Sequence, residues 1–83
     1  MNKRHPDAKD CDFWLGFEFE GPRASKAAAF FSAEGYETRA NPNGTFLVVA
    51  NPALGGILEM CGLLFLALEG LDDVTARMVP KIH

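Results

Sequence analysis

Apolar residues concentrate in one stretch of the chain, residues 54–68, which reads LGGILEMCGLLFLAL. Fourteen of these fifteen residues are apolar or glycine, and the exception is Glu59. A helix that is apolar all round is buried rather than solvated, because exposing apolar surface to water is unfavourable. We therefore expect a helix here that the remaining elements cover.

A two-residue alternation marks residues 11–20, CDFWLGFEFE. One face carries four large apolar side chains, Phe13, Leu15, Phe17 and Phe19, and the other face carries Trp14, Gly16, Glu18 and Glu20. This period is that of a strand with one buried face, and the bulk of the apolar set predicts a central strand.

The middle of the chain predicts a helix followed by a hairpin. Residues 22–34 are rich in alanine, place apolar residues at helical spacing, and are bracketed by Pro22 and Gly35, typical start and stop residues. Residues 36–40 and 45–50 read as two strands joined at Asn43-Gly44, a dipeptide suited to positive φ. Asn51 and Pro52 then predict the start of the apolar helix.

The last segment, residues 71–79, alternates again and predicts an edge strand before Pro80. The element order is therefore β-α-β-β-α-β, which predicts an α+β, ferredoxin-like fold. In that fold a four-stranded antiparallel sheet carries two helices on one face. We expect an N-terminal arm over residues 1–10, a single domain over residues 11–79 and a short tail over residues 80–83.

Composition narrows the classes of function. The 83 residues carry a net charge of −3, and the eight Lys and Arg are scattered along the chain. This disfavours direct nucleic-acid binding, which needs a clustered basic surface. The two cysteines, Cys11 and Cys61, fit a reducing cytoplasm better than a disulfide scaffold. Together with His5 and His83 they match no known metal-ligand spacing, so no metal or other cofactor is expected.

The apolar stretch is too short to cross a bilayer. Fifteen helical residues reach about 23 Å, whereas the hydrocarbon core is about 30 Å thick. Glu59 and three glycines also lie within it. The N-terminus has no apolar segment of the kind a signal peptide needs.

Two surfaces are candidates for contact with a partner. The first is an acidic surface beside an exposed tryptophan, formed if the first and last strands are neighbours; its residues are Asp12, Trp14, Glu18, Glu20, Asp72 and Asp73. Such a surface complements a basic partner, although the ordinary role of these charges is solubility. Coverage of the tryptophan by the chain's own termini is the competing interpretation.

The second candidate surface is the outward side of the apolar helix. Helical spacing predicts an inward side and an outward side. The inward residues are Leu54, Ile57, Leu58, Cys61, Leu64, Phe65 and Leu68, and the outward residues are Gly55, Glu59, Gly62, Leu66 and Glu69. Glycines seven residues apart permit close approach by another backbone, so Gly55, Glu59, Gly62 and Leu66 are candidates for homodimerisation. The alternative is that the helix simply tolerates its glycines.

No set of residues suggests catalysis. Ser25 and Ser32 lie in the predicted helix, and both histidines lie near the ends of the chain. The sequence offers no set of a nucleophile, a general base and a residue that orients the base. Glu18 and Glu20 share a strand face, where solvated carboxylates are far commoner than a catalytic pair. We expect a protein that is not an enzyme.

Residues 17–50 resemble the RraB-type ribonuclease E inhibitor family. The resemblance rests on Phe17-Glu18-Phe19, an alanine-rich helix leading to Phe30-Phe31, Gly35-Tyr36, and the hairpin end Leu47-Val48-Val49-Ala50. It covers about 40% of the chain and implies a small acidic protein that inhibits a nuclease by binding it. The acidic, tryptophan-containing ending of that family is absent here, so no functional residue is carried over.

These observations lead to two hypotheses. The first is a cytoplasmic, non-enzymatic inhibitor or regulator that covers a surface of a protein partner, as nuclease inhibitors, anti-CRISPR proteins and immunity proteins do. The second is a small-ligand-sensing domain that homodimerises. The second predicts a concave polar pocket near Gly55-Gly56, and the first predicts a flat patch around Trp14.

Overall fold

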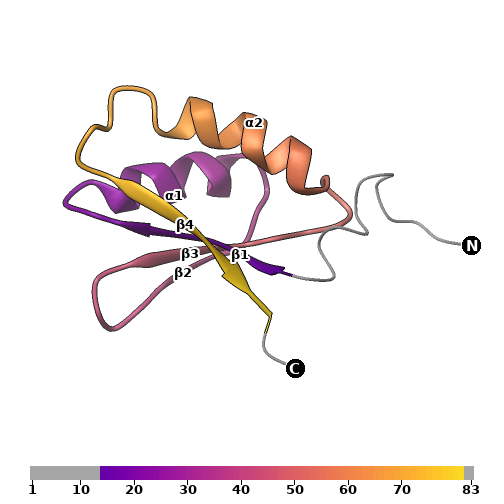
Figure 1. Cartoon of the computed structure of the whole chain (residues 1–83), viewed down its shortest axis with the longest axis horizontal. Helices are drawn as coiled ribbons and strands as arrows, with labels where there is room; N and C mark the ends of the chain where they lie inside the picture. The colour runs from indigo at the N-terminus through magenta and orange to yellow at the C-terminus, as the bar shows by residue number, and fades with distance from the viewer. Residues whose placement is uncertain (1–13, 82–83) are drawn as a thin grey trace, which may run out of the picture.

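The computed structural model describes residues 14–81 and shows a sheet covered on one side by two helices (Figure 1). The elements in chain order are β1 (Trp14–Glu20), α1 (Ala24–Ala33), β2 (Thr38–Ala40), β3 (Phe46–Val49), α2 (Ile57–Ala67) and β4 (Thr75–Pro80). The predicted order of elements is confirmed. The expected arm over residues 1–10 lies outside the described residues, and Pro80, placed in the tail, ends β4.

The four strands are antiparallel and follow the order β2-β3-β1-β4. β1 and β3 are the central pair, and β4 is an edge strand whose partner is β1. This is a ferredoxin-like arrangement, and both helices lie on the same face of the sheet (Figure 1). The predictions of a central first strand and a final edge strand are confirmed.

The core lies between the sheet and α1. Phe19 and Phe31 are fully buried with ring centroids 5.9 Å apart, and Tyr36 meets Phe31 edge-on at 5.5 Å. Ala24, Ala27 and Ala28 give α1 a smooth buried face, so the helix sits close to the strands. Gly35 has φ +99° at the end of α1, a left-handed conformation that favours glycine, as the sequence predicts.

An irregularity in β1 changes which side chains face the helices. The pairing of β1 with β4 shifts register between Trp14 and Gly16, so Trp14 lies on the same side as Phe17. Their rings are in edge-on contact at 5.0 Å, and Trp14 is 2% exposed. The prediction of an exposed Trp14 is therefore wrong, because a bulge breaks the strict alternation on which it rests.

The apolar helix begins later than its start signals predict. Asn51 accepts a hydrogen bond from the backbone N–H of Ala53 at 3.0 Å, which closes a separate turn. Gly56, in an extended conformation, is the residue before the first helical turn of α2. The prediction that Asn51 caps this helix is wrong, since the Gly55-Gly56 pair interrupts the chain between the turn and the helix.

The inward face of α2 also differs from the prediction. Met60 and Ala67 are its buried residues, whereas Leu58 and Phe65, predicted inward, are exposed. Four other residues predicted inward do pack against the core, namely Ile57, Cys61, Leu64 and Leu68, so the buried side is shifted only in part, toward Met60 and Ala67. Because nearly every position of α2 is apolar, its sequence pattern does not fix which side faces the core.

Candidate protein-binding surface

The solvent-facing side of α2 is an apolar surface. Phe65 is 81% exposed, Leu58 69% and Leu66 57%, and Leu54 in the preceding turn is also exposed. Residues 58, 62, 65 and 66 fall on one side of a helix because residue 62 follows residue 58 by four positions, and residues 65 and 66 follow residue 62 by three and four positions. We call these four residues the α2 face. A cluster of this kind marks an interaction site more often than scattered apolar residues do.

Gly62 forms a notch in the middle of the α2 face. A Cβ atom placed on Gly62 would meet nothing within 4 Å, so the space above it is open. Leu58 lies one turn before Gly62, and Phe65 and Leu66 lie one turn after it. A side chain from a partner can therefore enter between Leu58 and Phe65 and reach the backbone of α2.

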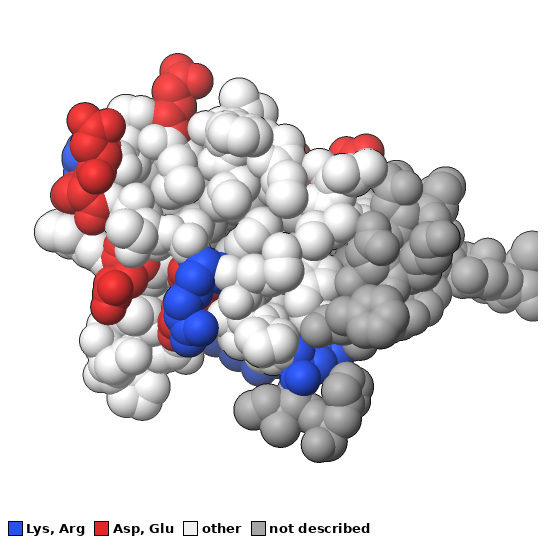
Figure 2. Space-filling view, viewed as in Figure 1, with Lys and Arg blue, Asp and Glu red and all other residues white. Residues whose placement is uncertain are grey.

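The charge around the α2 face is predominantly negative, with Arg23 of the α1 N-terminus paired to Asp73. No Lys or Arg occurs between Ala40 and Ala76, whereas this stretch contains Glu59, Glu69, Asp72 and Asp73. Figure 2 shows a mostly uncharged surface over α2, with red acidic side chains and part of a blue basic one at the left, where the loop between α2 and β4 lies. The C-terminal end of α2 adds the negative end of its helix dipole to these carboxylates.

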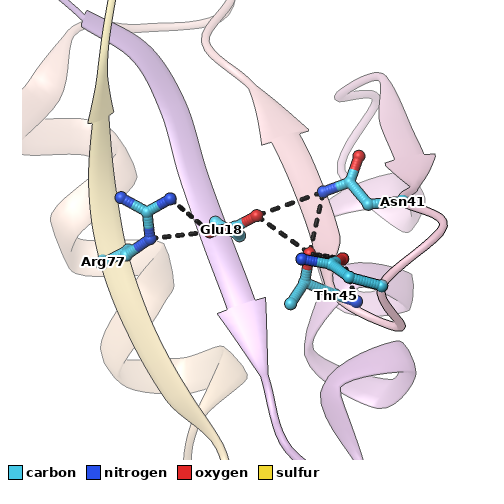
Figure 3. A network of polar contacts seen from close by, with 5 residues as sticks. Glu18, Asn41, Thr45 and Arg77 are labelled. Atoms are coloured by element: carbon cyan, nitrogen blue, oxygen red, sulfur yellow. Dashed lines mark hydrogen bonds and ion pairs between the residues drawn. The ribbon is translucent and has the colours of Figure 1, made fainter.

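A network of polar side chains lies on the open face of the sheet, opposite the helices (Figure 3). Glu18 Oε1 accepts a hydrogen bond from Arg77 Nε at 2.7 Å, and Oε2 accepts from Asn41 Nδ2 at 3.2 Å. The Thr45 hydroxyl lies 2.9 Å from the same Oε2 and 2.7 Å from Asn43 Oδ1. Its single proton serves one acceptor at a time, and a charged carboxylate is the stronger acceptor.

This network ties three strands together. Glu18 lies on β1, Arg77 on β4, and Thr45 directly before β3. The Thr45 hydrogen bond, and next the hydrogen bond from Arg77, lower the pKa of Glu18 below its ordinary value of 4.5. Beside Glu18 lies a polar depression of about 340 Å³ whose lining includes Glu20, Thr75 and Arg77.

Replacement of Glu18 by glutamine should make the free energy of unfolding less dependent on pH at acidic pH. The folded-state pKa of Glu18 is lowered, so its contribution is fully present above the ordinary value of 4.5. That contribution is lost as the pH falls through the lower folded-state pKa. The stability difference between the wild type and Glu18→Gln should therefore shrink between about pH 7 and about pH 3, as followed by urea-denaturation midpoints.

Glu20→Gln is the matched control for that experiment. Glu20 lies two residues along the same strand, is exposed, and makes no hydrogen bond or ion pair with another residue of the described part. A difference between Glu18→Gln and the wild type that stays constant over the whole pH range would contradict the prediction.

The first predicted surface is divided by the fold. Glu20 and Asp73 lie at one end of the sheet, where Arg23 pairs with Asp73 at 2.9 Å and lowers its pKa through a hydrogen bond. Trp14 is paired with Pro80 at the opposite end of β1. Glu18 is held by Arg77, and Asp12 lies outside the described residues. An acidic surface beside an exposed tryptophan is therefore not formed by the residues described.

The second predicted surface is formed in part. Gly62, Leu66, Glu59 and Glu69 are exposed, as predicted, but Gly55 is buried, and a Cβ on it would lie 2.6 Å from the Cβ of Glu59. Gly55 is thus a packing position beneath Glu59 and cannot receive another backbone. The exposed members share the surface with Leu58 and Phe65, which the sequence prediction placed inside.

Comparison with known proteins identifies no relative of this chain. No family model, no curated protein and no solved structure matches it. None of these comparisons bears on the resemblance to the RraB-type inhibitors. Within residues 14–81, no helix is both long and apolar enough to cross a bilayer. The same residues contain no group of three or more His, Cys, Asp or Glu placed to share a metal ion.

The surplus of apolar residues in α2 is the sequence signal for this surface. A helix that covers one side of a small sheet needs one apolar stripe, and the residues beyond it face outward. The orientation of α2 buries Met60 and Ala67 and leaves Leu58 and Phe65 in solvent. Fifteen nearly uniform apolar positions thus predict a second contact surface without saying which residues form it.

Proposed function

We propose that this protein is a non-enzymatic regulator that binds another protein through the α2 face and covers a surface of that partner. The observation that carries the proposal is the exposure of Leu58 and Phe65 on one side of a single helix. Burying two such side chains contributes about 1.5–3 kcal/mol each. This energy is gained only when a partner covers them.

The charge of the surroundings supports the inhibitor class named in the sequence analysis. Carboxylates near the α2 face, Glu69 and Asp72, favour a partner with a basic surface, since opposite charges steer association and exclude like-charged competitors. Proteins that act on nucleic acids carry such surfaces. An inhibitor that occupies one of them acts without any catalytic residue of its own.

The ligand-sensing alternative gains less support. It requires a polar pocket near Gly55-Gly56, yet the polar depression beside Glu18 lies on the open face of the sheet, and neither glycine is among its lining residues. Glu18 is already engaged by Arg77 and Thr45 within that depression. We therefore take the α2 face as the functional surface.

Affinity capture from cells that naturally produce the protein tests this proposal. The tagged wild type should retain one stoichiometric partner, and the double variant Leu58→Ser with Phe65→Ser should lose it, because the apolar contact is removed. Met78→Ser is the matched control, since Met78 is also an exposed large apolar residue but lies on β4. Retention of the same partner by the double variant would exclude the α2 face as the binding surface.

A further inference from the structure

We infer that the occupant of the α2 face is a basic amphipathic helix of the partner protein, docked along α2 with its Lys and Arg residues toward the α2 C-terminus. This inference rests on the proposed function and specifies the partner. α2 spans 11 residues, and a helix of that length extends about 16 Å. An elongated surface of this size fits one partner helix of about three turns.

The shape of the α2 face suits a helix rather than a strand or loop. Leu58, Gly62 and Phe65 present a ridge, a notch and a second ridge at successive helical turns. Helices pack by placing the ridges of one into the grooves of the other, with apolar residues repeating at three- and four-residue intervals. A partner helix with that repeat places one apolar side chain in the Gly62 notch and others beside Phe65.

Charge fixes both the sign and the direction of the partner helix. Glu69 and Asp72 follow directly after α2, are exposed, and make no ion pair with another described residue. No Lys or Arg lies on α2 or on the segments that flank it. A second copy of this chain would bring mainly carboxylates to this region, because its nearby Arg23 is already paired with Asp73, whereas a basic helix supplies further cations. The charge pattern therefore favours a basic partner over self-association.

Designed peptides of about 18 residues provide the test. The first carries Leu and Phe at three- and four-residue spacing with Lys and Arg on its flanks, the second carries Glu in place of Lys and Arg, and the third has the first composition in scrambled order. Titration of the full-length protein should give a Kd on the order of 10 μM for the first peptide. Binding of the acidic and scrambled peptides should be about tenfold weaker or absent.

Variants of the chain separate the apolar and the charged contributions. Leu58→Ser with Phe65→Ser should abolish binding of the basic peptide. Glu69→Lys with Asp72→Lys should reverse the preference, so that the acidic peptide binds better than the basic one. Both sites are exposed, so the circular dichroism spectrum should remain that of the wild type. Equal binding of the basic and acidic peptides would overturn the inference.

Three further outcomes distinguish this inference from the proposed function. If the wild type does not bind the basic peptide but the Leu58→Ser, Phe65→Ser variant loses the captured partner, the inference of a basic partner helix is wrong. The α2 face then remains the binding surface. If sedimentation shows a dimer that Phe65→Ser disperses, a second copy occupies the face and the inference is overturned. If the Leu58→Ser, Phe65→Ser variant no longer binds the basic peptide but still retains the captured partner, the proposed function is overturned instead.

Discussion

Replacement of Phe31 by alanine is expected to remove most of the free energy of unfolding of the protein. Phe31 is fully buried, and its ring meets Phe19, Phe30 and Tyr36 at centroid distances of 5.9, 5.8 and 5.5 Å. Truncation of a buried phenylalanine costs about 3–5 kcal/mol, because transfer energy is lost and a cavity remains. Small domains are stable by only about 5 kcal/mol, so a loss of this size leaves at most about 2 kcal/mol and brings the urea midpoint close to zero.

Phe65→Ala is the matched control, since it is the same substitution in the other helix. Phe65 is 81% exposed, so its loss should change the free energy of unfolding by no more than about 0.5 kcal/mol. Urea denaturation followed by circular dichroism measures both variants. Similar midpoints for Phe31→Ala and Phe65→Ala would contradict the placement of the core between α1 and the sheet.

Gly16→Ala is expected to be the most damaging of the glycine substitutions. A Cβ on Gly16 would lie 1.9 Å from the carbonyl oxygen of Val48, far inside van der Waals contact. Gly16 pairs with Val49 between the two central strands, so neither backbone can move without breaking the β1–β3 ladder. Overpacking a core lowers the free energy of unfolding by about 1–3 kcal/mol. A clash with a fixed backbone should cost at least about 3 kcal/mol.

Gly62→Ala supplies the control for that substitution and should act in the opposite direction. Gly62 lies inside α2, where alanine is favoured over glycine by about 0.5–1 kcal/mol, and nothing lies within 4 Å of its new methyl group. The denaturation midpoint should fall for Gly16→Ala and rise for Gly62→Ala. A stable, well-folded Gly16→Ala protein would contradict the close approach of β1 and β3.

The two helices contribute to different properties of the molecule. α1 is largely a structural helix, because its buried alanines and Phe31 bring it close to the sheet. α2 contributes Met60 and Ala67 to the core but places Leu58 and Phe65 in water. Substitutions on the outer side of α2 should therefore affect binding with little effect on folding, which makes the two roles separable by mutation.

The glutamates of β1 show how local partners redefine a predicted site. Their shared strand face predicts that Glu18 and Glu20 belong to one partner-binding surface. Arg77 and Thr45 engage Glu18 and lower its pKa, so this carboxylate helps to join β1, β3 and β4. Glu20 stays exposed near Asp72 and Asp73 at the other end of the strand from Trp14.

The sequence by itself determined the order of the elements and the architecture. Period-two alternation in β1, the alanine-rich segment of α1 and the turn at Asn43-Gly44 are local signals, and each acts within a few residues. Positions where a single residue type is required, such as Gly35 at φ +99°, were predictable for the same reason. These features need no knowledge of distant contacts.

Tertiary structure alone decided the burial of Trp14 and the orientation of α2. The shift of register beside Trp14 arises from the pairing of β1 with β4, more than 60 positions away along the chain, and it buries the side chain that alternation placed in solvent. The sequence also does not determine which side of α2 faces the core, since apolar residues surround the helix. α2 packs against α1 with Met60 and Ala67 in the core, and Leu58 and Phe65 lie on the opposite side of the helix, where they are exposed.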